Sequence, residues 1–92
     1  MSYYLKDPAA RLDYAIEWLP YLDGQTIVGS EWAVDPAEAG GIAFDSERFD
    51  ATRSAATLSG GIVGHVYSLS NRVTLSDGSV DERSICLRVE QR

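Results

Sequence analysis

The residue types that most often carry catalysis or bind metal ions are scarce in this chain. His65 is the only histidine and Cys86 the only cysteine, so a zinc site would need carboxylate ligands, and none lie at a close ligand spacing. A reactive thiol needs a neighbouring base, and Cys86 has only Arg88 two positions further along a predicted strand. We therefore interpret His65 as a packing or rim residue and Cys86 as a bystander thiol.

Two short motifs are similar to ligand-binding loops but lack the residues that would complete them. Gly60-Gly61 and Gly64 have the glycines of a phosphate-binding loop, without the lysine and the helix that must follow. Asp45, Glu47 and Asp50 have the carboxylates of a calcium loop, without its glycine and terminal glutamate. We predict a solvated acidic loop there. The sequence predicts no catalytic, cofactor-binding or metal-binding residue.

Aromatic side chains in the first third of the chain could form a carbohydrate-stacking face. They are Tyr3, Tyr4, Tyr14, Trp18, Tyr21 and Trp32. Half of them fall on the phase that is expected to face the core, and a core role is the simpler interpretation.

Composition and charge narrow the class of partner. The chain has 92 residues, of which 45% are apolar and 24% charged, as in an ordinary globular domain. A net charge of −6 and scattered basic residues argue against nucleic-acid binding. No apolar run approaches the ~20 residues of a membrane helix, and residues 1–8 lack the pattern of a signal peptide. We expect no nucleic-acid or membrane partner, no cofactor, and a protein made and kept in the cytosol or in a particle assembled there.

The elements that must position any site are clearest in the last third. Residues 59–92 contain two alternating runs on either side of Ser76-Asp77-Gly78-Ser79, the pattern of a β-hairpin with long arms. One face of the first arm carries His65, Tyr67, Leu69, Val73 and Leu75. One face of the second arm carries Ile85, Leu87 and Val89. Such alternation predicts that one face of the hairpin packs on a core and the other meets water.

The length of the turn determines which side chains face each other. A two-residue loop at Asp77-Gly78 would set the apolar face of one arm against the polar face of the other. A three-residue loop over residues 76–78 pairs Leu69 with Ile85 and keeps the apolar faces together. It needs a left-handed residue at its third position, where Gly78 sits without steric cost. We therefore predict the three-residue loop.

The same register turns three polar residues near the turn towards the core side. They are Asn71, Asp81 and Arg83. Because unpaired burial of polar groups is costly, they should bond each other or emerge at the rim of the sheet. We predict a structural polar cluster that shapes the end of the hairpin rather than binding a ligand.

Residues 7–22 fit two structures. Asp7-Pro8 is a good helix start, and apolar residues follow at helical spacing. The same stretch alternates, with Leu12, Tyr14, Ile16 and Trp18 on one phase, which suits a strand. Pro20 ends either element, and the pattern leaves residues 8–19 open between strand and helix.

Shorter strands are predicted between these two segments. Residues 25–34 form one, with an inner phase of Thr26, Val28, Ser30, Trp32 and Val34. Residues 42–44 and 53–59 form two more, and the polar stretches 35–41 and 45–50 are predicted as connections.

Five strands plus the ambiguous first one, at a spacing of about ten residues, predict an all-β sandwich. We expect residues 1–92 to form a single domain, with residues 1–10 as a flexible or extended arm. The predicted core consists of Ile16, Trp18, Val28, Trp32, Val34, Phe44, Leu58, Tyr67, Leu69, Val73, Ile85, Leu87 and Val89.

Two groups of residues form a distinctive pattern when they are taken together. The first runs from Tyr14 to Leu22 and continues with Thr26-Ile27, Ser30 and Trp32-Ala33-Val34. The second consists of Leu58-Ser59-Gly60-Gly61, Gly64, Tyr67, Asn71-Arg72-Val73, Ser76-Asp77-Gly78 and Asp81-Glu82-Arg83-Ser84. Over residues 12–91 the chain resembles a small protein family of tailed phages and prophages. Glu17 stands where that pattern has aspartate, and residues 35–57 match no part of it.

The resemblance implies an immunoglobulin-like antiparallel β-sandwich of about seven strands that closes with the C-terminal hairpin. It also implies a gene among those for capsid, connector and tail proteins, with a role that is usually unassigned, and a strand rather than a helix in the first segment. It brings no catalytic residue. The run from Tyr67 to Asn71 also resembles the penultimate strand of many bacterial immunoglobulin-like modules, which bears on the fold alone.

These observations lead to a non-enzymatic structural or accessory protein, located in the virion or, before assembly, in the host cytoplasm. It would bind other virion proteins through a sheet edge or an end loop, and homo-oligomerisation stays open. An alternative is a host-surface or carbohydrate-binding module that presents exposed tyrosines. A third hypothesis, a small enzyme or metal protein, would rely on His65, Cys86 and the acidic residues 45–50.

Overall fold

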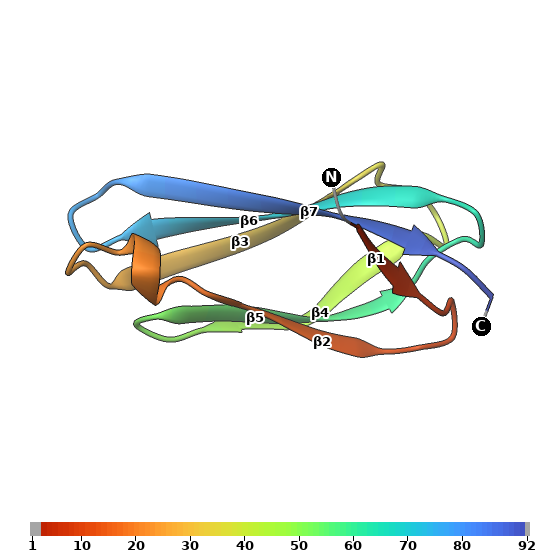
Figure 1. Cartoon of the computed structure of the whole chain (residues 1–92), viewed down its shortest axis with the longest axis horizontal. Coiled ribbons are helices and arrows are strands. Elements are labelled where there is room, and N and C mark those ends of the chain that lie inside the picture. Colours follow the sequence, from red (N-terminus) through yellow and green to blue (C-terminus); the bar gives the residue numbers. More distant parts are fainter. Residues whose placement is uncertain (1–2, 92) are drawn as a thin grey trace.

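The computed structural model describes residues 3–91; residues 1, 2 and 92, which the predicted arm and single domain include, lie outside the described residues. Two β-sheets pack face to face (Figure 1). The strands are β1 (Tyr3–Lys6), β2 (Leu12–Glu17), β3 (Ile27–Asp35), β4 (Ile42–Phe49), β5 (Arg53–Gly60), β6 (Val66–Leu75) and β7 (Val80–Val89), and a 3₁₀ turn, η1 (Leu19–Tyr21), follows β2. The predicted all-β sandwich of about seven strands is confirmed.

The strand order is that of an immunoglobulin-like sandwich. A four-stranded sheet has the order β1-β7-β6-β3, and a three-stranded sheet has the order β2-β5-β4. Only β4–β5 and β6–β7 are hairpins, and the other connections cross between the sheets, as in the immunoglobulin fold. β1 departs from the antiparallel expectation because it runs parallel to β7, whereas the other neighbouring pairs are antiparallel.

The C-terminal hairpin has the predicted register. Leu69 pairs with Ile85, as the three-residue loop requires. The backbone N–H of Gly78 donates to the carbonyl of Leu75 at 2.9 Å, and Gly78 has a φ of 88°. A side chain at that φ would be strained, which explains the glycine.

Residues 12–17 form a strand, as the family resemblance implies. β2 pairs with β5 from Leu12 opposite Leu58 to Glu17 opposite Arg53. Its inner phase leads into Trp18, which is 1% exposed. The alternation therefore outweighs the helical propensity of this stretch, because the strand gains a partner in β5 and buries its apolar phase.

One prediction about β3 is wrong. Val28, expected in the core, is 57% exposed, and Ile27 takes the buried position beside it. The cause is a bulge between Ile27 and Gly29, which shifts the register against β6 and reverses the phase of the first residues of the strand.

The predicted connection over residues 45–50 is also wrong. β4 continues to Phe49, with a bulge between Asp45 and Arg48 at which Ser46 adopts a φ of 51°. The bulge places Ser46 and Glu47 opposite the single residue Ala56, so one extra residue is accommodated without ending the pairing with β5. The true connection is confined to residues 50–52.

β1 lies within the segment expected to be an arm. It pairs with β7 from Tyr3 opposite Cys86 to Lys6 opposite Val89. Lys6 is 1% exposed, and its Nζ donates to the carbonyls of Gly60 at 2.7 Å and of the next residue at 2.9 Å. Burial lowers the pKa of this amine.

The core consists of two halves that meet at Tyr14 and Phe44, which contact both. The half next to η1, here called the η1 half, contains Ile16, Trp18, Leu22, Ile27, Trp32, Ala56, Val73 and Leu75. The half next to β1, here called the β1 half, contains Ile42, Leu58, Tyr67, Leu69, Leu87 and Val89.

Candidate interaction surfaces

The three residues of the predicted polar cluster lie next to one another on the hairpin, with Asn71 opposite Arg83, but differ in exposure. Asn71 is fully buried, whereas Asp81 and Arg83 are exposed at the rim. The guanidinium of Arg83 lies 4.9 Å from the ring centre of Tyr21, and Asp81 accepts a hydrogen bond from the backbone N–H of Glu82 at 2.8 Å. The three share one face of the hairpin, and none of the hydrogen bonds described for residues 3–91 joins them.

Asn71 is the centre of a buried polar network in the η1 half. Its Oδ1 accepts hydrogen bonds from Ser54 Oγ at 2.5 Å and from Trp18 Nε1 at 3.1 Å. Its Nδ2 donates to Ser30 Oγ at 2.9 Å and to the carbonyl of Glu31 at 3.1 Å. The network thus joins β3 and β6 of one sheet to β5 and the end of β2 of the other.

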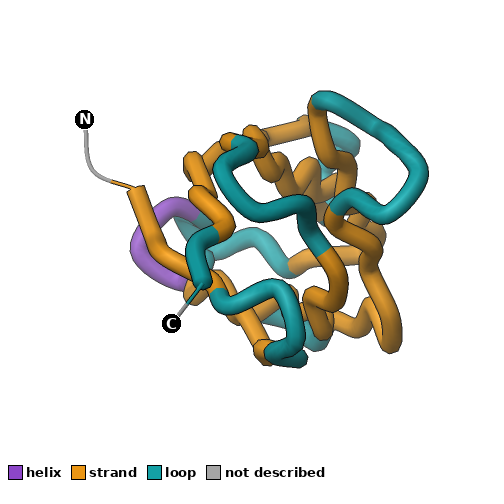
Figure 2. Tube along the Cα trace, turned by 90° about the vertical axis from the view of Figure 1, so that its right-hand side faces the viewer, coloured by secondary structure: helices purple, strands orange, loops and turns teal. Residues whose placement is uncertain are grey.

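A second polar group lies in the β1 half, at the end where the loops after β3 and β5 meet (Figure 2). Tyr67 Oη donates to Glu38 Oε1 at 2.6 Å and accepts from the N–H of Ile62, five residues upstream, at 3.1 Å. A tyrosine that bonds back in this way at the start of the sixth strand is the tyrosine corner of immunoglobulin-like sandwiches.

His65 belongs to the same group and lies at the rim. Its Nδ1 is 2.9 Å from Glu38 Oε1, and its side chain is 46% exposed. Hydrogen bonds from Tyr67 and then His65 hold the pKa of Glu38 below its ordinary value. His65 therefore orders the loop at residues 36–41 and has no second candidate ligand beside it among the described residues.

The acidic residues 45–50 do not converge on a cation. Asp45 pairs with Arg11 at 3.2 Å, and Asp50 accepts backbone hydrogen bonds that close the β4–β5 turn. Within residues 3–91 no three His, Cys, Asp or Glu side chains form a group that could hold a metal ion. Cys86 is half-buried on the outer face of the four-stranded sheet.

Paired charges cover the outer face of the three-stranded sheet. The pairs are Arg11 with Asp45, Arg48 with Asp13, and Arg53 with Glu17, at 3.2, 3.6 and 3.3 Å. These side chains are 43–72% exposed, so each pair contributes only ~0–1 kcal/mol to stability. Their consequence is a polar face whose charges remain accessible to a partner.

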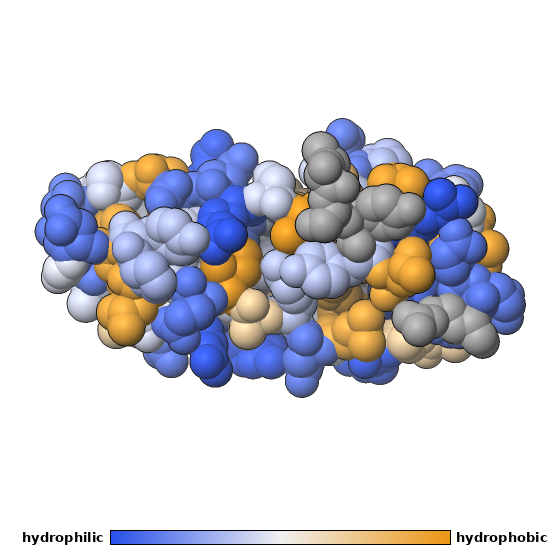
Figure 3. Space-filling model, in the orientation of Figure 1, coloured by the Kyte–Doolittle hydropathy of each residue, from blue (hydrophilic) through white to orange (hydrophobic). Residues whose placement is uncertain are grey.

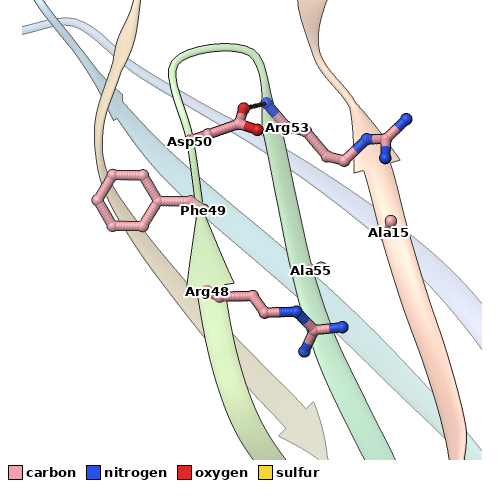
Figure 4. Close-up of a pocket in the computed structure, with 6 residues that line it drawn as sticks. All are labelled: Ala15, Arg48, Phe49, Asp50, Arg53 and Ala55. Atoms are coloured by element: carbon pink, nitrogen blue, oxygen red, sulfur yellow. Dashed lines mark hydrogen bonds between the residues drawn. The ribbon is translucent and has the colours of Figure 1, made fainter.

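A shallow hollow of about 370 Å³ lies among these charges (Figure 4). Ala15 and Ala55 form its floor, and their small side chains leave the space above the sheet open. Arg48 and Arg53 extend across the sheet from β4 and β5 in the direction of β2, and Phe49 points the other way. Two accessible guanidinium groups above an alanine floor suit a carboxylate or carbonyl group of another protein.

The side of the sandwich formed by β1, β2 and β7 is incompletely covered. β1 pairs with β7 only over residues 86–89. Beside the rest of β7 lie two hollows, of about 450 and 220 Å³, which share Tyr14, Arg83 and Ile85 in their linings. Tyr4, at the border of the larger hollow, is 53% exposed.

Exposed apolar side chains are dispersed over the surface. Figure 3 shows apolar patches separated by polar residues on the side that carries β1. The most exposed, Leu19, Val28 and Val80, belong to different elements.

Comparison with known families places this geometry in context. Residues 6–88 match the model of a family described as podophage GP4 fiber-tail adaptor protein gp77. The chain belongs to this family. No curated protein matches it. The described part of the chain contains no helix long and apolar enough to cross a membrane.

Membership of the fiber-tail adaptor family confirms the resemblance to a small tailed-phage family. It identifies the protein as a structural component of a phage virion. The match begins at the last residue of β1 and ends within β7, so it includes both sheets.

Proposed function

We propose that this protein is a non-enzymatic interaction module that connects fibre and tail components of a podophage virion. The observation that carries the proposal is the match to the fiber-tail adaptor family, which extends over residues 6–88 and therefore includes both sheets of the sandwich. The proposal is also supported by the contacts of the candidate catalytic residues: His65 contacts Glu38 at 2.9 Å, Asp45 pairs with Arg11, and Asp50 accepts backbone hydrogen bonds in the β4–β5 turn.

The sandwich has enough surface to contact two partners at once. Its dimensions are 42 × 27 × 19 Å and its accessible surface is 5407 Å². Two interfaces of about 800 Å² each would occupy less than a third of that surface. The loops at opposite ends and the outer sheet faces are therefore able to serve different partners.

The hollow on the three-stranded sheet is the first surface to assign to a partner. Arg48 and Arg53 already bind carboxylates of their own chain, with distances of 3.6 and 3.3 Å and exposed side chains. A partner carboxylate could compete for the same guanidinium groups without the cost of uncovering a buried charge. We propose that a fibre or tail protein places an acidic or carbonyl-bearing segment there.

Carbohydrate binding is less well supported by the positions of the tyrosines. Of the aromatics considered for stacking, Trp18 and Trp32 are buried and Tyr14 contacts the ring of Trp32 at a centroid distance of 5.9 Å, whereas Tyr4 and Tyr21 are 53% and 52% exposed. The ring of Tyr21 has Arg83 over it. A glycan array with the purified protein is a direct test, and specific binding on it would favour the host-surface alternative.

The decisive experiment is removal of the gene from the phage that encodes it. We expect particles that retain capsid and tail but lack fibres, and recovery of fibres when the wild-type gene is supplied in trans. Mass spectrometry of purified particles checks that the protein is present in the wild type. Fully fibred particles without the protein would contradict the proposal.

The hollow is tested by binding to purified fibre and tail proteins. We expect Arg53→Glu to weaken binding to one of them about tenfold or more, because it replaces attraction by repulsion. The matched control is Arg88→Glu, an exposed arginine with a carboxylate partner on the other sheet. Equal effects of the two substitutions would show that general charge, and not this surface, is responsible.

A further inference from the structure

The outer edge of β7 over residues 80–85 belongs to the longest hairpin and, like the outer edges of β2, β3 and β4, pairs with no described strand. β7 pairs with β6 over its full length, but β1 covers its other side only from residue 86 onwards. On the opposite side of the sandwich β3 and β4 belong to different sheets and do not pair, and their side chains Trp32 and Phe44 are in ring contact at 5.7 Å. Within residues 3–91 no strand pairs with the outer edge of residues 80–85.

The hydrogen-bonding phase of this edge follows from the hairpin. Ser79 accepts from the N–H of Leu75, and Val89 donates to the carbonyl of His65, so the odd-numbered residues of β7 bond to β6. Bonded and non-bonded pairs alternate along an antiparallel ladder. The N–H and C=O groups of Val80, Glu82 and Ser84 therefore point away from β6, towards the open edge.

Charged side chains on the inner phase stand at this edge. They are Asp81, which accepts from the N–H of Glu82, and Arg83, which lies over Tyr21. Inward-phase charges on an edge strand are a known device against uncontrolled strand pairing. Here the two charges are opposite and lie two residues apart, so they also define a self-complementary pattern.

We propose that two copies of this protein associate through this edge, with residues 80–84 of each running antiparallel about a two-fold axis at Glu82. In this register Asp81 of one copy faces Arg83 of the other, and the pair occurs twice. Val80 of one copy faces Ser84 of the other. The backbone N–H and C=O groups that point to the open edge, at Val80, Glu82 and Ser84, then pair with the same groups of the second copy. The four-stranded sheets of the two copies thereby form one continuous sheet.

The charges select this register over its neighbours. A two-fold axis at Asp81 or at Arg83 would place like charges in a non-hydrogen-bonded pair, where Cα atoms are only about 4.5 Å apart. With the axis at Glu82, the facing like charges are the two Glu82 side chains. They stand in a hydrogen-bonded pair, in which the Cα atoms are about 5.5 Å apart. Each Glu82 there is also balanced by Arg72 of its own chain, with 3.3 Å between the charged groups.

The extent of β1 limits the strength of the association. In the described residues, β1 pairs with β7 from Tyr3 opposite Cys86 to Lys6 opposite Val89. Five residues per copy bury far less than the about 800 Å² per partner of a standard interface, so we expect a Kd of about 100 μM or weaker. The inference goes beyond the adaptor role, because self-association and binding to fibre or tail proteins are separate measurements.

Sedimentation equilibrium of the purified chain over a concentration series tests the proposal. We expect a reversible monomer–dimer equilibrium for the wild type.

Arg83→Asp alone and Asp81→Arg alone should each weaken dimerisation about tenfold or more, because each creates two facing like-charge pairs. A mixture of the two variants should form heterodimers, and the double variant should dimerise like the wild type. Arg11→Asp, at an exposed arginine that pairs with Asp45 away from this edge and outside the hollow, is the matched control and should have no effect.

A second variant addresses the backbone and does not depend on charge. Ser84→Pro removes an N–H that points to the open edge and leaves the β6–β7 bonds intact, so it should abolish dimerisation while the fold persists. Circular dichroism confirms folding of each variant. A wild type that stays monomeric into the millimolar range would overturn the proposal, as would a dimer that survives Ser84→Pro. A wild-type protein that dimerises but does not bind purified fibre or tail proteins would instead count against the proposed function.

Discussion

The two halves of the core each contain a polar anchor, and the anchors differ in their access to water. In the η1 half, Asn71 is fully buried and bonds to groups from both sheets. In the β1 half, Tyr67 is buried, but its partner Glu38 and the adjoining His65 have side chains that are 28% and 46% exposed. A buried network must be complete because water cannot replace a lost partner, whereas a half-exposed one tolerates loss.

The difference also shows what holds the two sheets together. In antibody domains a disulfide joins the second strand to the strand that carries the tyrosine corner. Here the only cysteine is in β7, and Leu69 stands two residues after Tyr67, where antibody domains have the second cysteine. The hydrogen bond between Trp18 and Asn71 is one of the contacts that connect the two sheets here.

The comparison predicts that the largest loss of stability follows substitution of Asn71. Asn71→Leu leaves the hydroxyl of Ser54 and the indole N–H of Trp18 with fewer partners and leaves the carbonyl of Glu31 without its side-chain donor. We expect a loss of about 3 kcal/mol in the free energy of unfolding, measured by urea denaturation. Ser54→Ala, which keeps the bond between Trp18 and Asn71, should cost only about 1 kcal/mol. Equal losses of stability for the two variants would show that Asn71 is no more important to the network than Ser54.

An intermediate loss is expected at the tyrosine corner. Tyr67→Phe removes the hydroxyl that bonds Glu38 and the N–H of Ile62. Because water reaches Glu38, we expect a loss of about 1.5 kcal/mol, smaller than that of Asn71→Leu. Tyr21→Phe, at an exposed tyrosine, is the control and should change stability by less than about 0.5 kcal/mol. A loss at Tyr67 larger than at Asn71 would reverse the proposed ranking of the two anchors.

The two tryptophans extend the comparison within the η1 half. The Nε1 of Trp32 is buried and has no hydrogen-bond partner among the described residues, whereas that of Trp18 bonds both Asn71 and Ser54. Trp32→Phe loses packing alone, and we expect a cost of about 1 kcal/mol. Trp18→Phe should cost about twice as much, because it also breaks the network. Thermal and urea unfolding of the pair will show whether the hydrogen bonds, and not ring size, make the difference.

Those parts of the fold with a strict period were predictable from the sequence. The alternation on both sides of the turn, together with Gly78, was sufficient for the hairpin register. The bulge at Ile27 and the one after Asp45 were not predictable, because an inserted residue interrupts the period that would reveal it. Glu38 was missed for a different reason: its partners are distant in sequence, and a loop carries no periodic signal.

The candidate surfaces were only partly visible in the sequence. Asn71 was identified as polar and inward, but its partner Ser54 was not, although it shares a phase with Ala56 and Leu58 in β5. Arg48 lies within residues 35–57, which match no part of the family pattern, and within the stretch 45–50 that was predicted as a connection. The sequence did indicate a charged outer face, because Asp13, Ala15 and Glu17 alternate on one phase of the first segment. The matching pattern in β4, which includes Arg48, was hidden by the bulge.

The smallest expected effect concerns pH and the half-exposed anchor. The pKa of Glu38 is lowered in the folded protein by hydrogen bonds from Tyr67 and His65, relative to an ordinary value of 4.5. A carboxyl with a lowered folded pKa contributes stability that is complete above the unfolded pKa and is lost as the pH falls through the folded pKa. We therefore expect the wild type to lose stability as the pH falls from about 5, with Glu38 responsible for part of the slope.

Other carboxyls contribute to the same slope, so the measurement must isolate Glu38. The pKa values of Asp13, Asp50 and Asp77 are also lowered by hydrogen bonds. Glu38→Gln keeps an acceptor for Tyr67 but cannot titrate, and it should unfold with a shallower dependence on pH below about 5 than the wild type. Tyr67→Phe should lie between the two, because Glu38 then keeps only its contact with His65. If all three proteins show the same slope, the hydrogen bonds of the tyrosine corner do not favour the charged form of Glu38. The contrast between a buried anchor that is insensitive to pH and an exposed anchor that responds to it would then fail.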